Sequence, residues 1–231
     1  MNAFVGSRVA LLVVLLPTAA WAQSGPQPAT EAAQKVLDVL AGVESGLRST
    51  SYQHGTRVDE RLGLYHWDCS GMADWVLRRS APMARRVIPQ QRPLARDFYT
   101  AIARSPVGTQ RRGWQRLTSP AEIRPGDVYA WMKAPMFRHR RNTGHVGFVV
   151  GTPMPSPQFQ GVWLMRVADA TGIAHGADDT RPLGSGGGYG TATMGFLFDP
   201  AGEPIAYGWY GHGQQPENFI PTKIVFGRVW R

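Results

Sequence analysis

The sequence predicts an α+β fold in which N-terminal helices pack on a central antiparallel β-sheet. Three segments with helical patterning lie in the first half of the chain, and β-rich runs bounded by turn residues follow them. Helices grouped ahead of strands are typical of α+β domains. The 231-residue chain also contains 27 glycines and 18 prolines, which suits many short strands and turns.

The first residues predict a secretory signal peptide over residues 1–22. Arg8 precedes an apolar run at 9–16, and Ala-Trp-Ala ends at Ala22 as a cleavage site would. The apolar run is shorter than the ~20 residues that a spanning helix needs. We therefore expect residues 23–231 to form one exported domain, soluble in the periplasm or outside the cell, monomeric and without stable membrane insertion.

Three helices are predicted in order. Residues 30–47 carry apolar side chains at the spacing of one helical face. The second helix begins at Cys69, because Asp68 is a favourable N-cap and the residues that follow keep an apolar helical spacing. Pro93 opens the third helix, since proline is tolerated in a first helical turn.

The second half of the chain predicts strands. A hairpin-like turn is predicted at residues 199–202, Asp-Pro-Ala-Gly. The glycine-rich run 185–190 is either a loop at the edge of a substrate site or a mobile hairpin tip, and we favour the tip. The predicted strands lie at residues 127–132, 144–151, 162–169, 194–199, 205–210 and 223–230.

Cys69, the only cysteine, is the candidate nucleophile. Free backbone N–H groups and the helix dipole favour a thiolate in a first helical turn, so we expect an exposed thiol with a lowered pKa. An exported chain with one cysteine cannot form an internal disulfide, and an unpaired thiol is a liability there unless it serves chemistry. The alternative is a buried structural cysteine.

His145 is the candidate base, because it opens the apolar run 146–150 and would be held rigidly at the mouth of a buried strand. An acidic residue at the end of the next strand, Asp169, could orient its imidazole. Asp169 could instead simply begin a turn. Three further residues are alternative orienters: Asp178, Asp179 and Asn142.

The other histidines give weaker signals. His54 and His212 lie in glycine-flanked loops, His139 lies in an arginine run, and His175 follows a Thr-Gly turn. We expect these four to be solvated or to have only local roles, and we keep His66 as a residue of the site wall. One cysteine and scattered histidines lack metal-ligand spacing, so no metal or other cofactor is expected.

The chain is strongly basic, with a formal net charge of +9. Arginine clusters at residues 85–86, 111–112 and 138–141 suggest a binding rim for an anionic partner such as peptidoglycan or another cell-wall polymer. The charge could equally serve solubility alone. The aromatic interleaving that nucleic-acid binding requires is absent, so nucleic acid is not an expected partner.

Three motifs, in this order, resemble the NlpC and CHAP groups of papain-like cysteine peptidases and amidases. They are Asp-Cys-Ser-Gly at 68–71, Arg-Pro-Gly-Asp-Val at 124–128 and Gly-His-Val-Gly-Phe-Val at 144–149. The resemblance spans about residues 36–169. It implies a papain-like fold, with the cysteine helix packed on an antiparallel sheet whose first two core strands begin at the second and third motifs.

The resemblance also implies a catalytic triad of Cys69, His145 and Asp169. The proline-containing segment 152–161 lengthens the path from His145 to Asp169 and weakens the assignment of the third position.

A tyrosine upstream of the cysteine assists the oxyanion site in such proteins. It would fall on Tyr52, although Tyr65 competes because the stretch from Tyr52 to the cysteine is long. Asp68, Ser70 and His66 are the other candidate substrate-binding or oxyanion residues.

The family resemblance, the export signal and the basic charge together predict an exported cysteine hydrolase. It would cleave peptide amide bonds, first of all in peptidoglycan stem peptides, through a thioester at Cys69. Two alternatives remain: a papain-like thiol enzyme that acts on acyl lipids or other amides, and a catalytically silent cell-wall-binding protein.

Overall fold

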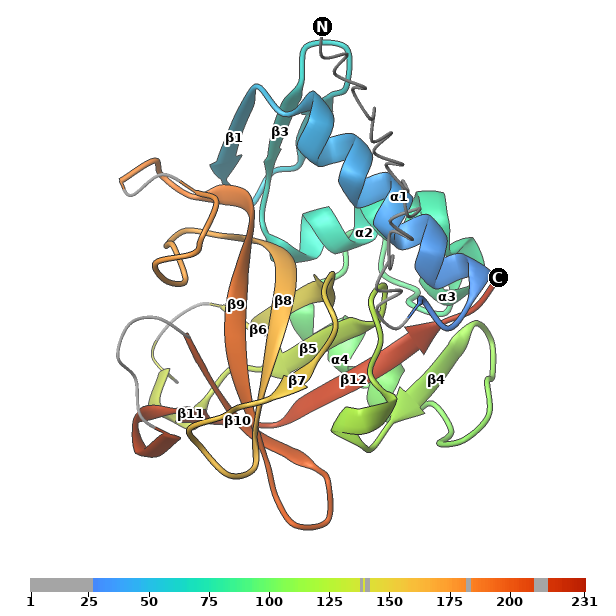
Figure 1. The fold of residues 1–231 in the computed structure, drawn as a ribbon. Helices are drawn as coiled ribbons and strands as arrows, with labels where there is room; N and C mark the ends of the chain where they lie inside the picture. The colour runs from blue at the N-terminus through green and yellow to red at the C-terminus, as the bar shows by residue number, and fades with distance from the viewer. Residues whose placement is uncertain (1–26, 138, 140–141, 182–183, 210–215) are drawn as a thin grey trace, which may run out of the picture.

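The computed structural model describes residues 27–137, 139, 142–181, 184–209 and 216–231. In this part of the chain, helices cover one face of a large, curled antiparallel sheet, which confirms the predicted α+β class (Figure 1). Among these residues, no helix is both long and apolar enough to cross a membrane. The predicted signal peptide, His212 and Arg138, Arg140 and Arg141 lie outside the described residues.

The three predicted helices are present, and local capping explains where each begins. Helix α1 (Glu31–Gly46) starts after Thr30, whose hydroxyl accepts a hydrogen bond from the Ala33 N–H. Helix α2 (Cys69–Ser80) starts after Asp68. Helix α4 (Ala95–Ala103) follows Pro93, and the Asp97 carboxylate accepts from the Leu94 N–H. A short helix that was not predicted, α3 (Pro82–Arg86), follows α2.

The large sheet contains all six predicted strands. Its order is β11-β10-β9-β8-β6-β5-β12-β4, with β7 paired to β8, and every pairing is antiparallel. Strands β4, β7 and β11 were not predicted. The strands are β4 (Trp114–Leu117), β5 (Val128–Met132), β6 (Gly144–Val149), β7 (Met154–Pro155), β8 (Val162–Thr171), β9 (Gly188–Phe198), β10 (Pro204–Trp209), β11 (Ile220–Pro221) and β12 (Ile224–Val229).

A second, three-stranded sheet precedes α2 and was not predicted. It consists of β1 (Ser49–Tyr52), β2 (Arg57–Asp59) and β3 (Leu64–Trp67). Strand β3 pairs with β1 in parallel and with β2 in antiparallel orientation. These strands are short and half-buried, so they carry little of the apolar alternation that reveals a strand in a sequence.

The glycine-rich run is not the hairpin tip that was predicted. Gly188 and Gly190 belong to the start of β9, and the backbone N–H of Tyr189 donates to the Thr50 hydroxyl of β1 at 2.8 Å. The Gly186 carbonyl accepts from the Tyr52 N–H. The run therefore joins the two sheets, because glycines allow the two backbones to approach closely.

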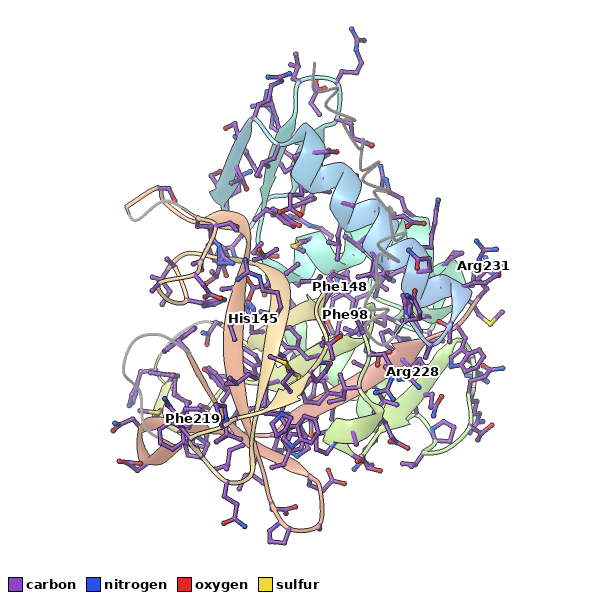
Figure 2. All side chains as sticks on the ribbon, viewed as in Figure 1. Phe98, His145, Phe148, Phe219, Arg228 and Arg231 are labelled. Carbon is purple, nitrogen blue, oxygen red and sulfur yellow. The ribbon has the colours of Figure 1, made fainter. Side chains whose placement is uncertain are left out.

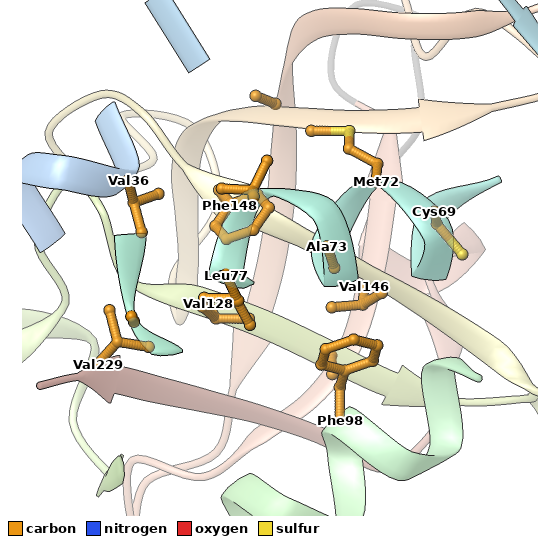
Figure 3. Close-up of a cluster of buried hydrophobic side chains, with 14 of the residues drawn as sticks. Val36, Cys69, Met72, Ala73, Leu77, Phe98, Val128, Val146, Phe148 and Val229 are labelled. Carbon is orange, nitrogen blue, oxygen red and sulfur yellow. The ribbon is translucent and has the colours of Figure 1, made fainter. Parts of the chain in front are cut away.

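The hydrophobic core between helices and sheet is centred on α2 (Figure 3). Met72 and Leu77 of α2 belong to the same buried cluster as Val146 and Phe148 of β6 and Phe98 of α4. All five side chains are at most 1% exposed. This packing fixes α2, and with it the position of Cys69, against the start of β6.

A second buried cluster lies on the opposite face of the sheet. Trp131 of β5 stacks on Tyr207 of β10 with ring centroids 4.0 Å apart, and Phe196 of β9 meets Phe226 of β12 at 5.1 Å. In each of these two ring contacts the two strands are not neighbours in the sheet order, so the sheet must curl around this aromatic cluster.

The Pro-Gly-Asp turn at residues 125–127 ties α1 to the sheet. Gly126 has a φ of +89°, and a Cβ there would collide with the Ala33 carbonyl of α1. Asp127 is buried, and it accepts hydrogen bonds from the Arg124 N–H at 2.8 Å and from the Arg228 guanidinium at 2.9 Å.

Gly126→Ala should therefore lower the free energy of unfolding by about 3 kcal/mol, since it adds a steric clash to an unfavourable backbone conformation. Gly108→Ala is the matched control, because Gly108 has a φ of +73° but open space around its Cβ position. Urea denaturation should show a loss of about 1 kcal/mol in the control. Equal losses in the two variants would contradict the proposed clash.

One of the predicted surface arginines is structural. Arg85 is buried, and its guanidinium contacts the Asp74 carboxylate and donates to the carbonyls of Ile88 and Gln90. The prediction that Arg85 contributes to a binding rim is therefore wrong. Arg86, Arg111 and Arg112 remain on the exposed surface.

Candidate active site

Cys69 is the first residue of α2, where the chain passes from β3 through Asp68 into the helix. The Asp68 carboxylate accepts hydrogen bonds from the Gly71 N–H at 2.7 Å and from the Ser70 hydroxyl at 2.8 Å, which fixes the first helical turn. Figure 3 shows Cys69 at the end of α2, beyond Met72 and Ala73. The expectation of an exposed thiol is wrong: Cys69 is 6% exposed, because the apolar face of α2 continues to its first residue.

His145 is the second residue of β6 and pairs in register with Trp131 of β5. The centroid of its ring lies 4.8 Å from that of Trp131, with the two ring planes tilted by 34°, and its side chain is 12% exposed. Figure 2 shows His145 on the large sheet. The imidazole Nε2 lies 2.7 Å from the Asp169 Oδ2. This contact leaves Nδ1 as the ring nitrogen that can face the Cys69 thiol.

The charge of its surroundings decides the protonation of His145. Burial favours the neutral ring, but charge interaction and hydrogen bonding with Cys69 and Asp169 outweigh it and raise the pKa of His145 to about 9. An imidazolium is thus favoured at neutral pH.

Asp169 of β8 is a fully buried carboxylate with four donors around it. Its Oδ2 accepts from His145 Nε2 and His175 Nε2, each at 2.7 Å, and from the Tyr129 hydroxyl at 3.0 Å. Its Oδ1 accepts from the Arg181 guanidinium at 2.6 Å. Burial by itself would raise the pKa of Asp169, but His175 and His145 hold it well below its ordinary range, so the carboxylate stays ionised.

His175 and Arg181 were not predicted as site residues. The expectation that His175 is solvated or has only a local role is wrong, since it is buried and contacts Asp169 directly. Arg181 reaches the same carboxylate through the space that Gly190 leaves open, where a Cβ would lie 2.5 Å from the Arg181 Nε. No local sequence pattern predicts either residue at the site, because they reach Asp169 only through the path of the loop after β8.

The other candidate orienters lie elsewhere among the described residues. The Asp178 carboxylate pairs with Arg166 at 2.7 Å, and Asp179 accepts from the backbone N–H of His175 at 2.6 Å. Asn142 lines a hollow beside His145. Of the four residues considered for the third position, Asp169 is the one that hydrogen-bonds His145 in the described structure.

Tyr52, rather than Tyr65, lies at the site. The parallel pairing of β1 with β3 places Tyr52 opposite Trp67, two residues before Cys69. Burial raises the pKa of Tyr52 above its ordinary value, and the charges of Cys69, Asp68 and Asp169 add to the effect. Tyr65 packs instead in the core against Trp67 and Trp75.

The remaining candidates have mainly local contacts. Asp68 caps α2 and also lies 3.2 Å from Nδ1 of the exposed His54, while Ser70 hydrogen-bonds Asp68. His66 on β3 pairs with the Ser49 hydroxyl at 3.2 Å and lines neither of the hollows described below.

One hollow lies beside His145, and another lies beside the first turn of α2. The first, of about 380 Å³, is lined by His145, His175 and Tyr52 together with several aromatic side chains. The second, of about 620 Å³, is lined by Asp68 and Ser70 and by polar side chains of the α2 surface. The Tyr52 ring packs edge-on against His54, a residue of the second hollow, at 5.9 Å, so these two rings lie where the hollows adjoin.

His145, Asp169 and His175 place three potential metal-ligand atoms within 4.8 Å of one another. Both imidazole rings already hydrogen-bond the Asp169 carboxylate, and Arg181 brings a fixed positive charge to it. This charge disfavours a cation at the cluster. The arrangement is better suited to holding an imidazole beside a thiol.

No family model, curated protein or solved structure matches this chain.

The pKa of His145 predicts a pH dependence for turnover. In the hydrolysis proposed below, an imidazolium protonates the leaving amine, so kcat/KM should fall on an alkaline limb near pH 9. Because the folded pKa is raised above the ordinary 6.5, the stabilising contribution of His145 should be complete below pH 6.5 and lost as the pH rises through about 9.

Two profiles test this dependence. The difference in unfolding free energy between the wild type and His145→Gln should shrink between pH 6.5 and about 9. In Asp169→Asn the alkaline limb of kcat/KM should move to lower pH, since one of the charges that raise the pKa is gone. If the alkaline limb of kcat/KM lies at the same pH in Asp169→Asn as in the wild type, Asp169 does not set the pKa of His145.

Proposed function

We propose that this chain is a cysteine hydrolase that cleaves amide bonds by acyl transfer to water. One observation carries the proposal: a cysteine begins the helix that packs on the strand of His145, an imidazole whose Nε2 is held by a buried, ionised carboxylate. A nucleophile, a base within reach and a group that orients the base are the parts that nucleophilic catalysis requires.

In the proposed reaction, the Cys69 thiolate attacks the amide carbonyl carbon and forms a carbon–sulfur bond. The oxyanion is stabilised by the backbone N–H of Cys69 and by the Tyr52 hydroxyl. The His145 imidazolium gives its proton to the nitrogen as the carbon–nitrogen bond breaks, which leaves a thioester and a neutral imidazole. That imidazole then takes a proton from water, which attacks the thioester and releases the acid and the thiolate.

The preferred substrate is a peptide amide in peptidoglycan, and the protein is proposed to act outside the cytoplasm. The three ordered motifs and the packing of a cysteine helix on an antiparallel sheet support a papain-like enzyme of the NlpC and CHAP kind. The net charge of +9 favours an anionic polymer that carries stem-peptide carboxylates.

A thiol enzyme for other amides or acyl groups is the second candidate function. The aromatic lining of the hollow beside His145 favours it, because such a lining suits an apolar group better than a charged stem peptide. Both candidate functions use the same nucleophile and base, so product identity separates them.

Digestion of purified sacculi with the protein, followed by mass spectrometry, tests the proposal. We expect soluble fragments with new free amines from the wild type and none from Cys69→Ala. The inactive variant should still bind sacculi at low salt and release them at high salt, because salt screens exposed charges. Binding without fragments from the wild type would instead identify a silent wall-binding protein.

A further inference from the structure

The hollow beside His145 is the feature that the proposed reaction leaves unassigned. It has a volume of about 380 Å³, within the range of about 300–1,000 Å³ that is usual for ligand sites. Its described lining is mainly apolar and comes from four separate parts of the chain. The apolar side chains are Tyr52, Trp131, Ala134, Phe137, Ile173, Tyr207 and Trp209.

The direction of proton transfer decides which half of a substrate this hollow would hold. A general acid must lie within hydrogen-bond reach of the atom that it protonates. His145 lines this hollow, whereas Asp68 and Ser70, the sequence neighbours of Cys69, line the second hollow. The nitrogen that leaves must therefore lie on the side of His145, so the amine half of the substrate faces the first hollow.

The chemistry of the lining then selects the amine. Among the described residues that line the hollow, none carries a carboxylate. A cationic substituent on the amine would lose its hydration there without gaining a negatively charged partner. An apolar substituent would instead cover Ile173, which is 60% exposed although it is a large aliphatic side chain.

We propose that the hollow beside His145 is the leaving-group subsite and that it selects amides whose amine half carries an uncharged apolar or aromatic group. The inference rests on the proposed function, and it narrows the substrate class of that same site. The aromatic rings that form the hollow are held rigidly: Trp131 stacks on Tyr207 at 4.0 Å, and Trp209 lies nearly parallel to His175 at 6.1 Å. Because these side chains are already ordered, binding a ligand costs little of their conformational entropy.

A peptide-amide library tests the subsite. The acyl half is varied over L and D residues, and the amine half is leucine, phenylalanine, glycine, glutamate or lysine amide. Mass spectrometry of the released amines gives relative kcat/KM values. We expect leucine and phenylalanine amides to exceed glycine amide by at least about tenfold, the range of discrimination that an apolar pocket achieves, with lysine amide lowest.

Two matched variants test whether the hollow causes any preference among the amine halves. Ile173→Glu should lower the leucine-to-glycine ratio by about fivefold, since it removes apolar contact and places a charge in the pocket. Ile205→Glu is the control, because Ile205 is an exposed isoleucine on β10, 42% exposed, that does not line the hollow. Its ratio should match that of the wild type.

The outcomes separate this inference from the proposed function. Cleavage without preference among the amines, or a preference for glutamate or lysine amide, overturns the subsite while the hydrolase stands. An equal loss of selectivity in both isoleucine variants also overturns it. If the wild type cleaves no member of the library and no sacculi, the proposed function fails and this inference fails with it.

Discussion

Cys69→Ala is expected to lower kcat for amide hydrolysis by at least about 10⁴-fold, because the substitution removes the atom that forms the thioester. Cys69 is buried in the cluster that packs α2 on the sheet, so the variant should also lose about 1 kcal/mol of stability through the missing sulfur. Turnover of the sacculi or of the amide library, together with urea denaturation, measures the two effects separately.

Ala73→Ser provides the control for Cys69. Ala73 is a fully buried α2 residue of the same cluster, one turn further along the helix, and it does not line either hollow. Burying a hydroxyl there should cost at least as much stability as Cys69→Ala, about 1–3 kcal/mol, without a comparable loss of kcat. If Cys69→Ala kept near-normal turnover, the cysteine would be structural and the proposed mechanism would be wrong.

Asp169→Asn is expected to lower both kcat and stability. An amide at this position cannot hold the imidazolium of His145 in the same way, and the corresponding change in a serine triad costs about 10⁴-fold in kcat. The guanidinium of Arg181 is 1% exposed and would lose a contact of 2.6 Å to a negative charge. Removing one partner of a buried ion pair costs about 3–5 kcal/mol, and we expect the lower end because Asp179 still pairs with Arg181 at 3.3 Å.

Two comparisons separate the proposed role of Asp169 in orienting His145 from its structural role. Asp178→Asn changes a carboxylate of the same loop region that pairs with Arg166, so it should leave kcat within about twofold. His145→Ala combined with Asp169→Asn should be no slower than His145→Ala alone, because residues that act as one unit are not additive. Independent losses from the two substitutions would place Asp169 outside the catalytic unit.

The carboxylate that we propose to orient His145 also contributes to stability. The four groups that donate to Asp169 come from β5, β6 and the loop after β8, so the residue cross-links the site. For an acid whose folded pKa is lowered, this stabilising contribution is present above its ordinary pKa of 3.8 and is lost as the pH falls through the folded value. Acid should therefore loosen the site and inactivate the protein together.

The elements that local chemistry specifies could be predicted from the sequence. The Asp68 cap and the apolar spacing that follows it placed the start of α2 at Cys69, and the six main strands followed from apolar runs between turn residues. His145 and Asp169 could be proposed because each stands at the end of such a run. Capping and periodicity act within a few residues, so the sequence alone determined these features.

Only the tertiary structure decided which residues surround His145 and Asp169. The parallel pairing of β1 with β3 places Tyr52, and not Tyr65, at the site. The loop after β8 folds back so that His175 and Arg181 contact Asp169. The aromatic hollow exists because the sheet curls until β5 and β10 meet across it. Strand register, loop path and sheet curvature join residues that are far apart in the chain, and no local propensity encodes those distances.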